Sequence, residues 1–159
     1  MINVQEALLE LLTRNTTIST YVVVNGERRI YPQIAREFTA EEDVRQYMTY
    51  AIISRDRVRT ILGPQDWAHT RLQLDIYSRS YSVGQELSDA VSSALDGFRG
   101  EVVVGSDRLD VASVELESVE DLYEESTDSR EISWHRVSVD LLIWHEMSRP
   151  AVASTEQGG

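Results

Sequence analysis

Apolar residues at the start of the chain recur at helical spacing. They are Val4, Leu8, Leu11 and Leu12, each three or four positions from a neighbour on the same side of a helix. Asn3 and Glu6 have the spacing of a capping box, in which each side chain satisfies a free amide of the first turn. The pattern therefore predicts a helix over residues 4–14.

A short hairpin is predicted next. Residues 18–24 and 27–31 are rich in β-branched and aromatic side chains, and the dipeptide Asn25-Gly26 between them tolerates the positive φ angles of a type I′ turn. Residues 32–46 carry many charges without a clear period, which indicates a loop.

The middle of the chain predicts a second, longer hairpin. Residues 47–59 are rich in aromatic and β-branched side chains and read as one long strand, after which Gly63-Pro64 breaks the chain. Residues 71–76 then alternate between polar and apolar side chains, which is typical of a strand with one face in water.

The clearest amphipathic pattern follows this hairpin. Ser82 and Gln85 have capping-box spacing at its start, and Gly97 and Gly100 lie near its end. We expect a second helix here, with its apolar stripe at steps of three and four residues. The stripe consists of Val83, Leu87, Val91, Ala94, Leu95 and Phe98.

The last third of the chain predicts three strands and no further helix. Two short strands are expected at residues 101–104 and 109–116, followed by an acidic connection over residues 117–131. In the final strand, alternate apolar residues share one face. They are Val137, Val139, Leu141 and Ile143.

This order of elements predicts an α+β fold, namely a mainly antiparallel sheet with two amphipathic helices packed on one face. Short turns join most of the strands, and helices on one side are the simplest way to cover the apolar face of such a sheet. We expect residues 1–147 to form a single domain. Residues 148–159 have little apolar content and are expected to be a disordered tail.

Charge narrows the set of partners. The chain has 159 residues and a formal net charge of −12, and all 15 of its basic residues are Arg, which codon bias would explain. Residues 1–60 hold 8 Arg and 8 acids, whereas residues 61–159 hold 7 Arg and 19 acids. An acidic surface repels phosphate backbones and anionic lipid, which disfavours electrostatic binding to nucleic acid or a membrane.

The start of the chain carries Glu6 and Glu10 where a signal peptide would be positively charged, and no apolar run approaches the length of a membrane span. We therefore expect the protein to stay in the cytoplasm of the cell that makes it. The chain contains no Cys, which excludes a disulfide scaffold, a cysteine zinc site and thiol catalysis.

The sequence holds no motif for catalysis, and we predict no enzyme activity, cofactor or metal. It has no dinucleotide or Walker A phosphate loop, no nucleophile elbow and no HExxH helix. His135 and His145 would share a face of one strand, but ten residues at about 3.3 Å each separate them by about 33 Å. We interpret both as strand-surface histidines. The acid pair Glu115 and Glu117 has the spacing for acid-base chemistry, but such pairs arise by chance among 27 acids.

Two oppositely charged groups are candidates for a contact with another chain. Arg55, Arg57 and Arg59 alternate along a predicted strand end and would project from one side of it, where they either pair with carboxylates or act as a solvated edge against aggregation. The acids between Glu115 and Asp128 form an acidic run, which is either a solvated loop or the complementary half of a head-to-tail interface that closes into a ring. Together the candidate interface residues are Arg55, Arg57, Arg59, Trp67, Glu117, Glu120, Asp121, Glu124 and Glu125.

Several stretches, in order along nearly the whole chain, carry a resemblance to a known family. The sequence resembles the tail-completion, or tail-to-head joining, proteins of long-tailed bacteriophages and gene transfer agents. It departs from the family pattern at Arg45-Gln46, where a proline often precedes the second hairpin, and in the length of the acidic connection. The similar stretches are VQEALL (4–9), RIYP (29–32), LGP (62–64), LQLDIY (72–77), ALDG (94–97), HRVSVD (135–140) and IW (143–144).

The resemblance implies a virion structural protein. Such a subunit would form a ring of six copies on the head-proximal end of the tail tube, end tube polymerisation and join the tail to the head connector. Its implied partners are itself, the major tail tube protein and a head connector or stopper protein, with DNA only in passage through the channel and no membrane. Its implied location is the head-tail junction of the virion, after assembly in the host cytoplasm.

Three alternatives stay open at this point. A neck or connector stopper protein shares the size and ring symmetry. An acidic monomeric binding module that mimics nucleic acid fits the charge but not the ordered family stretches. A small hydrolase is the third alternative, and it has no motif to support it.

Overall fold

The computed structural model describes residues 1–39, 41–124 and 134–147, and it has the predicted α+β class. Its helices are α1 (Val4–Arg14), α2 (Thr16–Val22) and α3 (Tyr81–Leu95). Its strands are β1 (Val23–Val24), β2 (Glu27–Arg28), β3 (Ile30–Pro32), β4 (Gln46–Thr60), β5 (Gly63–Ser78), β6 (Gly100–Val104), β7 (Asp107–Glu124) and β8 (Trp134–Glu146).

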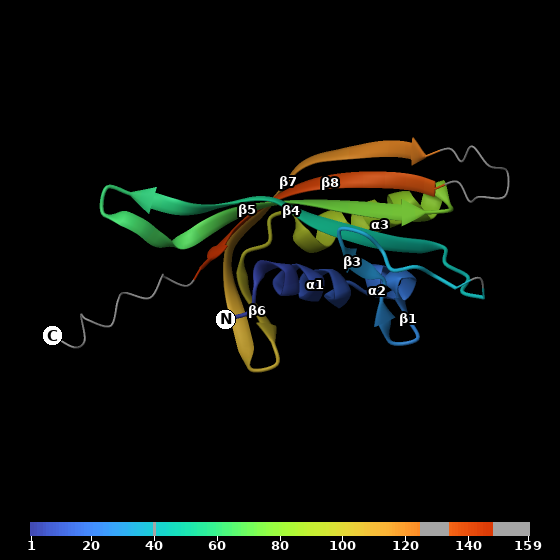
Figure 1. The fold of residues 1–159 in the computed structure, drawn as a ribbon, viewed down its shortest axis with the longest axis horizontal. Helices are drawn as coiled ribbons and strands as arrows, with labels where there is room; N and C mark the ends of the chain where they lie inside the picture. The colour runs from blue at the N-terminus through green and yellow to red at the C-terminus, as the bar shows by residue number, and fades with distance from the viewer. Residues whose placement is uncertain (40, 125–133, 148–159) are drawn as a thin grey trace.

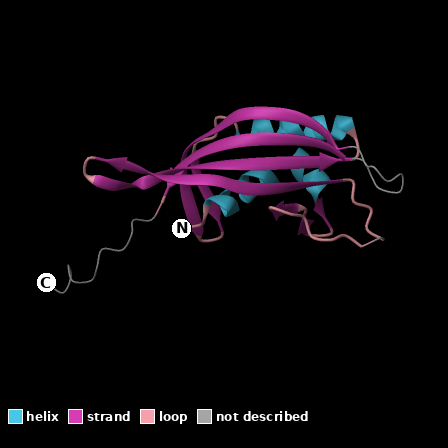
Figure 2. Ribbon diagram, turned by 45° about the horizontal axis from the view of Figure 1, so that its top comes forward, coloured by secondary structure: helices cyan, strands magenta, loops and turns pink. Residues whose placement is uncertain are grey.

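A six-stranded sheet in the order β3-β4-β5-β8-β7-β6 forms the centre of the molecule (Figure 1). β3 runs parallel to β4, and the other neighbours in this sheet are antiparallel. β1 and β2 pair separately as a small hairpin. Figure 2 shows the helices behind the long strands, so that one face of the sheet lies against helices while the other is turned to the viewer.

The core lies between the helices and the sheet. From Ala68 of β5 and from Val137 of β8 onwards every second residue is buried, and the apolar ones further along β5 and on β8 meet the apolar stripes of α1 and α3. Burying one such aliphatic side chain contributes roughly 1.5–3 kcal/mol, so this alternation fixes which face of each strand is turned inward. The buried residues include Leu8 and Leu12 of α1, Leu72, Leu74 and Ile76 of β5, Leu87 and Leu95 of α3, and Val137, Val139, Leu141 and Ile143 of β8.

The two predicted helices begin at capping residues. The side chain of Asn3 accepts a hydrogen bond of 2.8 Å from the amide of Glu6, as its position in the predicted capping box requires. The predicted cap of the second helix was wrong by two residues, because Ser80 rather than Ser82 accepts from the amide of Val83. Ser80 and Ser82 hydrogen-bond to each other, so two suitable hydroxyls lie at this helix start.

The first predicted hairpin was half wrong. Residues 18–22 belong to α2, a helix that the sequence did not predict. Asn15 caps this helix by accepting a hydrogen bond from the amide of Ile18, and Ile18 and Val22 lie one turn apart on its buried side. The turn itself is as predicted: Asn25 and Gly26 have φ angles of 52° and 79°, and they join β1 to β2.

The acidic connection was also wrong at its start. Residues 117–124 continue β7, which pairs with β8 as far as Glu124 opposite Trp134. Acidic residues are depleted in strands, which is why the sequence predicted a loop, but a sheet edge tolerates charged side chains. Residues 125–131 and the predicted tail at 148–159 lie outside the described residues.

Candidate subunit interface

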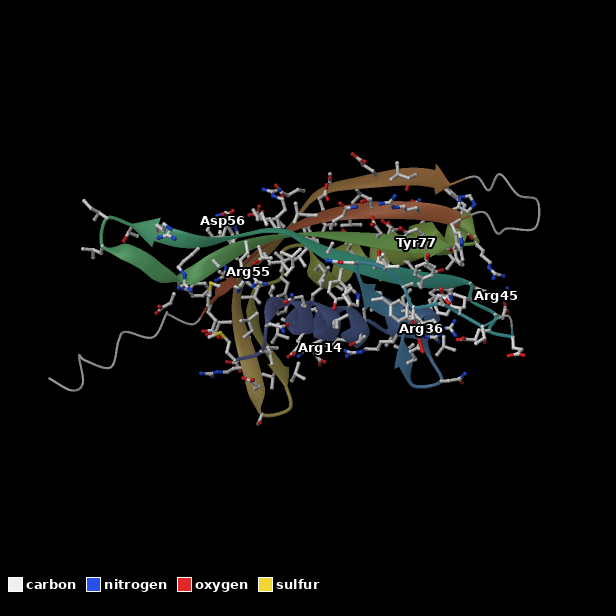
Figure 3. The ribbon with its side chains drawn as sticks, viewed as in Figure 1. Arg14, Arg36, Arg45, Arg55, Asp56 and Tyr77 are labelled. Atoms are coloured by element: carbon white, nitrogen blue, oxygen red, sulfur yellow. The ribbon has the colours of Figure 1, made fainter. Side chains whose placement is uncertain are left out.

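β4 and β5 together form a hairpin that projects beyond the helix-covered part of the sheet (Figure 1). We call residues 53–67 the arm. Arg55 pairs in register with Thr70 and Arg57 with Ala68, so both arginines lie on the face of the sheet that carries the core residues of β5. Asp56, opposite His69, lies on the other face. Figure 3 shows Arg55 and Asp56 at the base of the arm.

Arg59 and Trp67, the other two candidates on the arm, do not continue the alternation of Arg55 and Arg57. A register shift lies between Arg57 and Arg59, so Arg59 pairs opposite Pro64 and the regular alternation of the three arginines is interrupted. Trp67 lies at the arm's base, where it is partly exposed and pairs opposite Glu146 of β8. The structure therefore places all three arginines on one hairpin but gives only Arg55 and Arg57 an uninterrupted alternation.

The acidic candidates are divided between the two faces of the sheet. Glu117 forms an ion pair with Arg71 across the sheet rather than with an arginine of the arm. Glu120 lies opposite Ser138 on the face away from the helices, whereas Asp121 lies opposite Val137 on the helix side and accepts a hydrogen bond of 2.8 Å from Gln85 of α3. Glu124 is the last residue of β7, and Glu125 lies outside the described residues.

An arginine at the other end of the molecule holds the loop between β3 and β4 in place, which sequence reasoning missed. Arg36 contacts Glu27 at 2.8 Å and Glu42 at 2.6 Å, and its guanidinium lies 4.7 Å from the ring centre of Phe38. Hydrogen bonds from Arg36 and from Tyr31 lower the pKa of Glu27 to about 2. The alternating charges of residues 27–42 were the available signal, because a stretch with both signs can fold onto itself.

A group of aromatic side chains on the open face of the sheet packs against Phe38 of this loop. Tyr47 and Tyr77 stack with ring centres 4.7 Å apart, and Trp134 meets Tyr47 edge-on at 5.2 Å. Phe38 lies 5.8 Å from Tyr47 and connects the loop to this group. These side chains pack together at this end of the sheet. Figure 3 labels Tyr77 and Arg36 in this region.

His145 is buried, which corrects the expectation of a strand-surface histidine. Its Nε2 lies 2.7 Å from the Thr70 hydroxyl, and its Nδ1 lies 2.7 Å from the carbonyl oxygen of Glu146. Because a carbonyl oxygen only accepts, Nδ1 donates to Glu146, and in the neutral ring Nε2 then accepts from the Thr70 hydroxyl. Burial lowers the pKa of His145 below its ordinary value of 6.5.

A groove of about 270 Å³ lies where the base of the arm meets the start of the chain, and its charged lining is Arg55, Glu146 and the terminal amine. That amine forms an ion pair of 2.5 Å with Asp107. Within residues 1–39, 41–124 and 134–147, no three His, Asp or Glu side chains gather as a metal site would require. None of the helices in these same ranges is both long and apolar enough to cross a membrane.

Comparison with protein families identifies the chain. The family model described as tail completion protein gp17 matches residues 6–146, most of the length of the sequence. The chain belongs to the tail completion protein gp17 family. It is therefore a structural component of a tail, as the resemblance in the sequence predicted.

A solved structure has the same fold. It is described as the virion of a native gene transfer agent (GTA) particle, and one of its chains superposes with a TM-score of 0.61. The match covers 90% of this chain and 94% of that one, at 14% sequence identity. None of the curated proteins compared with the sequence matches it.

Proposed function

We propose that the chain forms a ring of six copies at the head-proximal end of a tail tube, where it ends tube polymerisation and joins the tail to the head connector. The match to the tail completion family over residues 6–146 is the observation that carries this proposal. In this role the chain contacts itself, the major tail tube protein and a connector or stopper protein. DNA passes through the ring without being bound, and the protein is assembled in the host cytoplasm.

The shape and charge of the subunit support this role. Its long hairpin arm carries Arg55, Arg57 and Arg59, while the acids of β7 lie elsewhere on the same subunit. Opposite charges at different places on one chain allow a head-to-tail contact, and such contacts close into rings when the rotation between copies allows it. A net charge of −12 also suits a conduit, because carboxylates do not retain a passing phosphate backbone.

Deletion of the gene from the particle-producing genome tests the proposal. We expect filled heads together with tails of uncontrolled length or tails that remain unjoined, and restoration of normal particles by the unaltered gene supplied separately. Normal particles without the gene would refute the role. Tails of normal length that fail only to join would instead indicate a connector stopper, and the protein's position in labelled particles would confirm which of the two it is.

A further inference from the structure

The tip of the arm exposes apolar side chains that do nothing for the fold. Ile61 and Leu62 form the turn between β4 and β5 and have relative exposures of 101% and 90%. Turns of this kind normally carry Gly, Asn, Asp or Pro. Ile53 adds a third exposed apolar side chain at the base of the arm. The adjacent apolar pair at the end of a projecting, solvated hairpin indicates a contact with another molecule.

The arm also differs in charge from the rest of the molecule. It contains three arginines and two aspartates, in a chain whose net charge is −12. Arg55 and Arg59 are exposed, and Arg59 lies one residue pair from the turn, next to the apolar tip. A partner surface for the arm should therefore be apolar at its centre and acidic around it.

A groove that offers an exposed aromatic ring and a carboxylate lies at the opposite end of the same sheet. A groove of about 100 Å³ lies between the first turns of α3 and the ends of β7 and β8. Tyr81, which is 57% exposed, and Asp121 line it on the helix side, where the Tyr81 ring meets His135 edge-on at 5.7 Å. Leu122 and Arg136 pair with each other at its rim, and their side chains lie on the open face of the sheet. Asp89 is exposed on α3 one helical turn after Gln85, which also lines the groove, whereas Glu86 faces α2 and accepts a hydrogen bond of 2.8 Å from Tyr21.

The arm and this groove cannot meet within one chain. Trp67 at the base of the arm and Ser78 at the other end of β5 are eleven residues apart on one strand, or about 36 Å. The two surfaces are different and lie at opposite ends, so pairing them joins copies head to tail. Repeated from copy to copy, this pairing can close into a ring; only reciprocal pairing between two copies would give a two-fold dimer.

We infer that the arm of each copy docks in the groove between α3 and β7 of a second copy. Ile61 and Leu62 pack on Tyr81 next to the rim residue Leu122, while Arg59 faces Asp121. This inference rests on the proposed ring, and it specifies which two surfaces form the boundary between subunits.

The absence of cysteine from the chain permits a direct cross-linking test. Cysteines are introduced together as Ile61→Cys and Leu122→Cys, and purified particles are treated with a short bis-maleimide, which tolerates more separation than a disulfide does. The inference predicts a ladder of covalent multimers that ends at the copy number of the ring. The matched control pairs Ile61→Cys with Ile34→Cys, which is 82% exposed on the loop before β4, and it should give no ladder.

Two results would overturn this assignment while leaving the proposed function intact. The first is particles that contain the variant at the head-tail junction but show no more cross-linking than the control. The second is cross-linking of the tip to a different virion protein. Absence of the unaltered protein from the junction would instead refute the proposed function itself.

Charge exchange gives a second readout that does not depend on cross-linking. We expect Arg59→Glu alone and Asp121→Arg alone each to lower the yield of joined particles about tenfold or more, because each places like charges face to face. Combining the two should restore most of the yield. A double variant no better than the single ones would show that these residues do not face each other, provided that all three variants unfold at the same denaturant concentration as the unaltered chain.

Discussion

The hairpin of β4 and β5 buries its apolar side chains in the body of the molecule and exposes them at the tip of the arm. In the body of the molecule, Leu72, Leu74 and Ile76 of β5 are fully buried against the helices. In the arm, Ile61 and Leu62 of the same hairpin are almost entirely in water. The first set accounts for folding of the chain, whereas the second has no role inside it. The apolar residues at the tip of the arm therefore indicate a contact with another molecule.

The largest expected effect tests the body. Leu74→Ala leaves a cavity between β5 and the helices, and it should lower the free energy of unfolding by about 2–5 kcal/mol. Unfolding in urea, followed by circular dichroism, measures this change. A loss below about 1 kcal/mol would mean that the sheet and helices are not packed as described.

A second effect is expected at His145, where the arm leaves the body. Because burial lowers the pKa of His145 below 6.5, the unfolded chain takes up a proton that the folded chain resists, and stability falls as the pH drops below about 6.5. His145→Gln removes this term. Urea unfolding between pH 7.5 and pH 5 should therefore show a shallower pH dependence for the variant, and an unchanged slope would count against a buried neutral ring.

A third effect concerns the end of the body farthest from the arm. Hydrogen bonds from Arg36 lower the pKa values of Glu27 and Glu42 from 4.5 to about 2, so their stabilising contribution is complete above about pH 4.5 and is lost as the pH falls towards 2. Arg36→Gln should make this acid limb shallower. Arg45→Gln is the control, because Arg45 meets Asp43 in an exposed pair that contributes little. Equal behaviour of the two variants would contradict the role given to Arg36.

The smallest effect on stability is expected at the tip of the arm. Ile61→Ala should change the free energy of unfolding by no more than about 0.5 kcal/mol, because the side chain is already in water in the folded state. The same urea experiment used for Leu74→Ala measures it. A loss comparable to that of Leu74→Ala would show that the tip is part of the core after all and would remove the basis for a docking role.

Periodicity predicted most of the sheet and two of the helices, and it failed where tertiary contacts decided the outcome. Thr16, Thr17, Ile18 and Val22 favour a strand by type, yet Asn15 caps them and the core buries Ile18 and Val22, so they form α2. The acids of residues 117–124 favour a loop by type, but pairing with β8 extends β7 through them.

The candidate site was predictable only in part for the same reason. The alternation of Arg55 and Arg57 is local and could be read from sequence, whereas the register shift before Arg59 depends on how β5 pairs with β4. The groove takes Tyr81 from α3 and Leu122 from β7, which are 41 positions apart in the sequence, and no local pattern joins them. The exposed tip was visible as the apolar pair Ile61-Leu62 before Gly63-Pro64, but a sequence does not show what covers it.

Electron cryomicroscopy of intact particles tests the central claim most directly. The account predicts a ring of this chain at the junction of head and tail, in which the tip of each arm lies against α3 and β7 of the neighbouring copy. Density for the chain away from that junction, or a single copy without neighbours of its own kind, would contradict it.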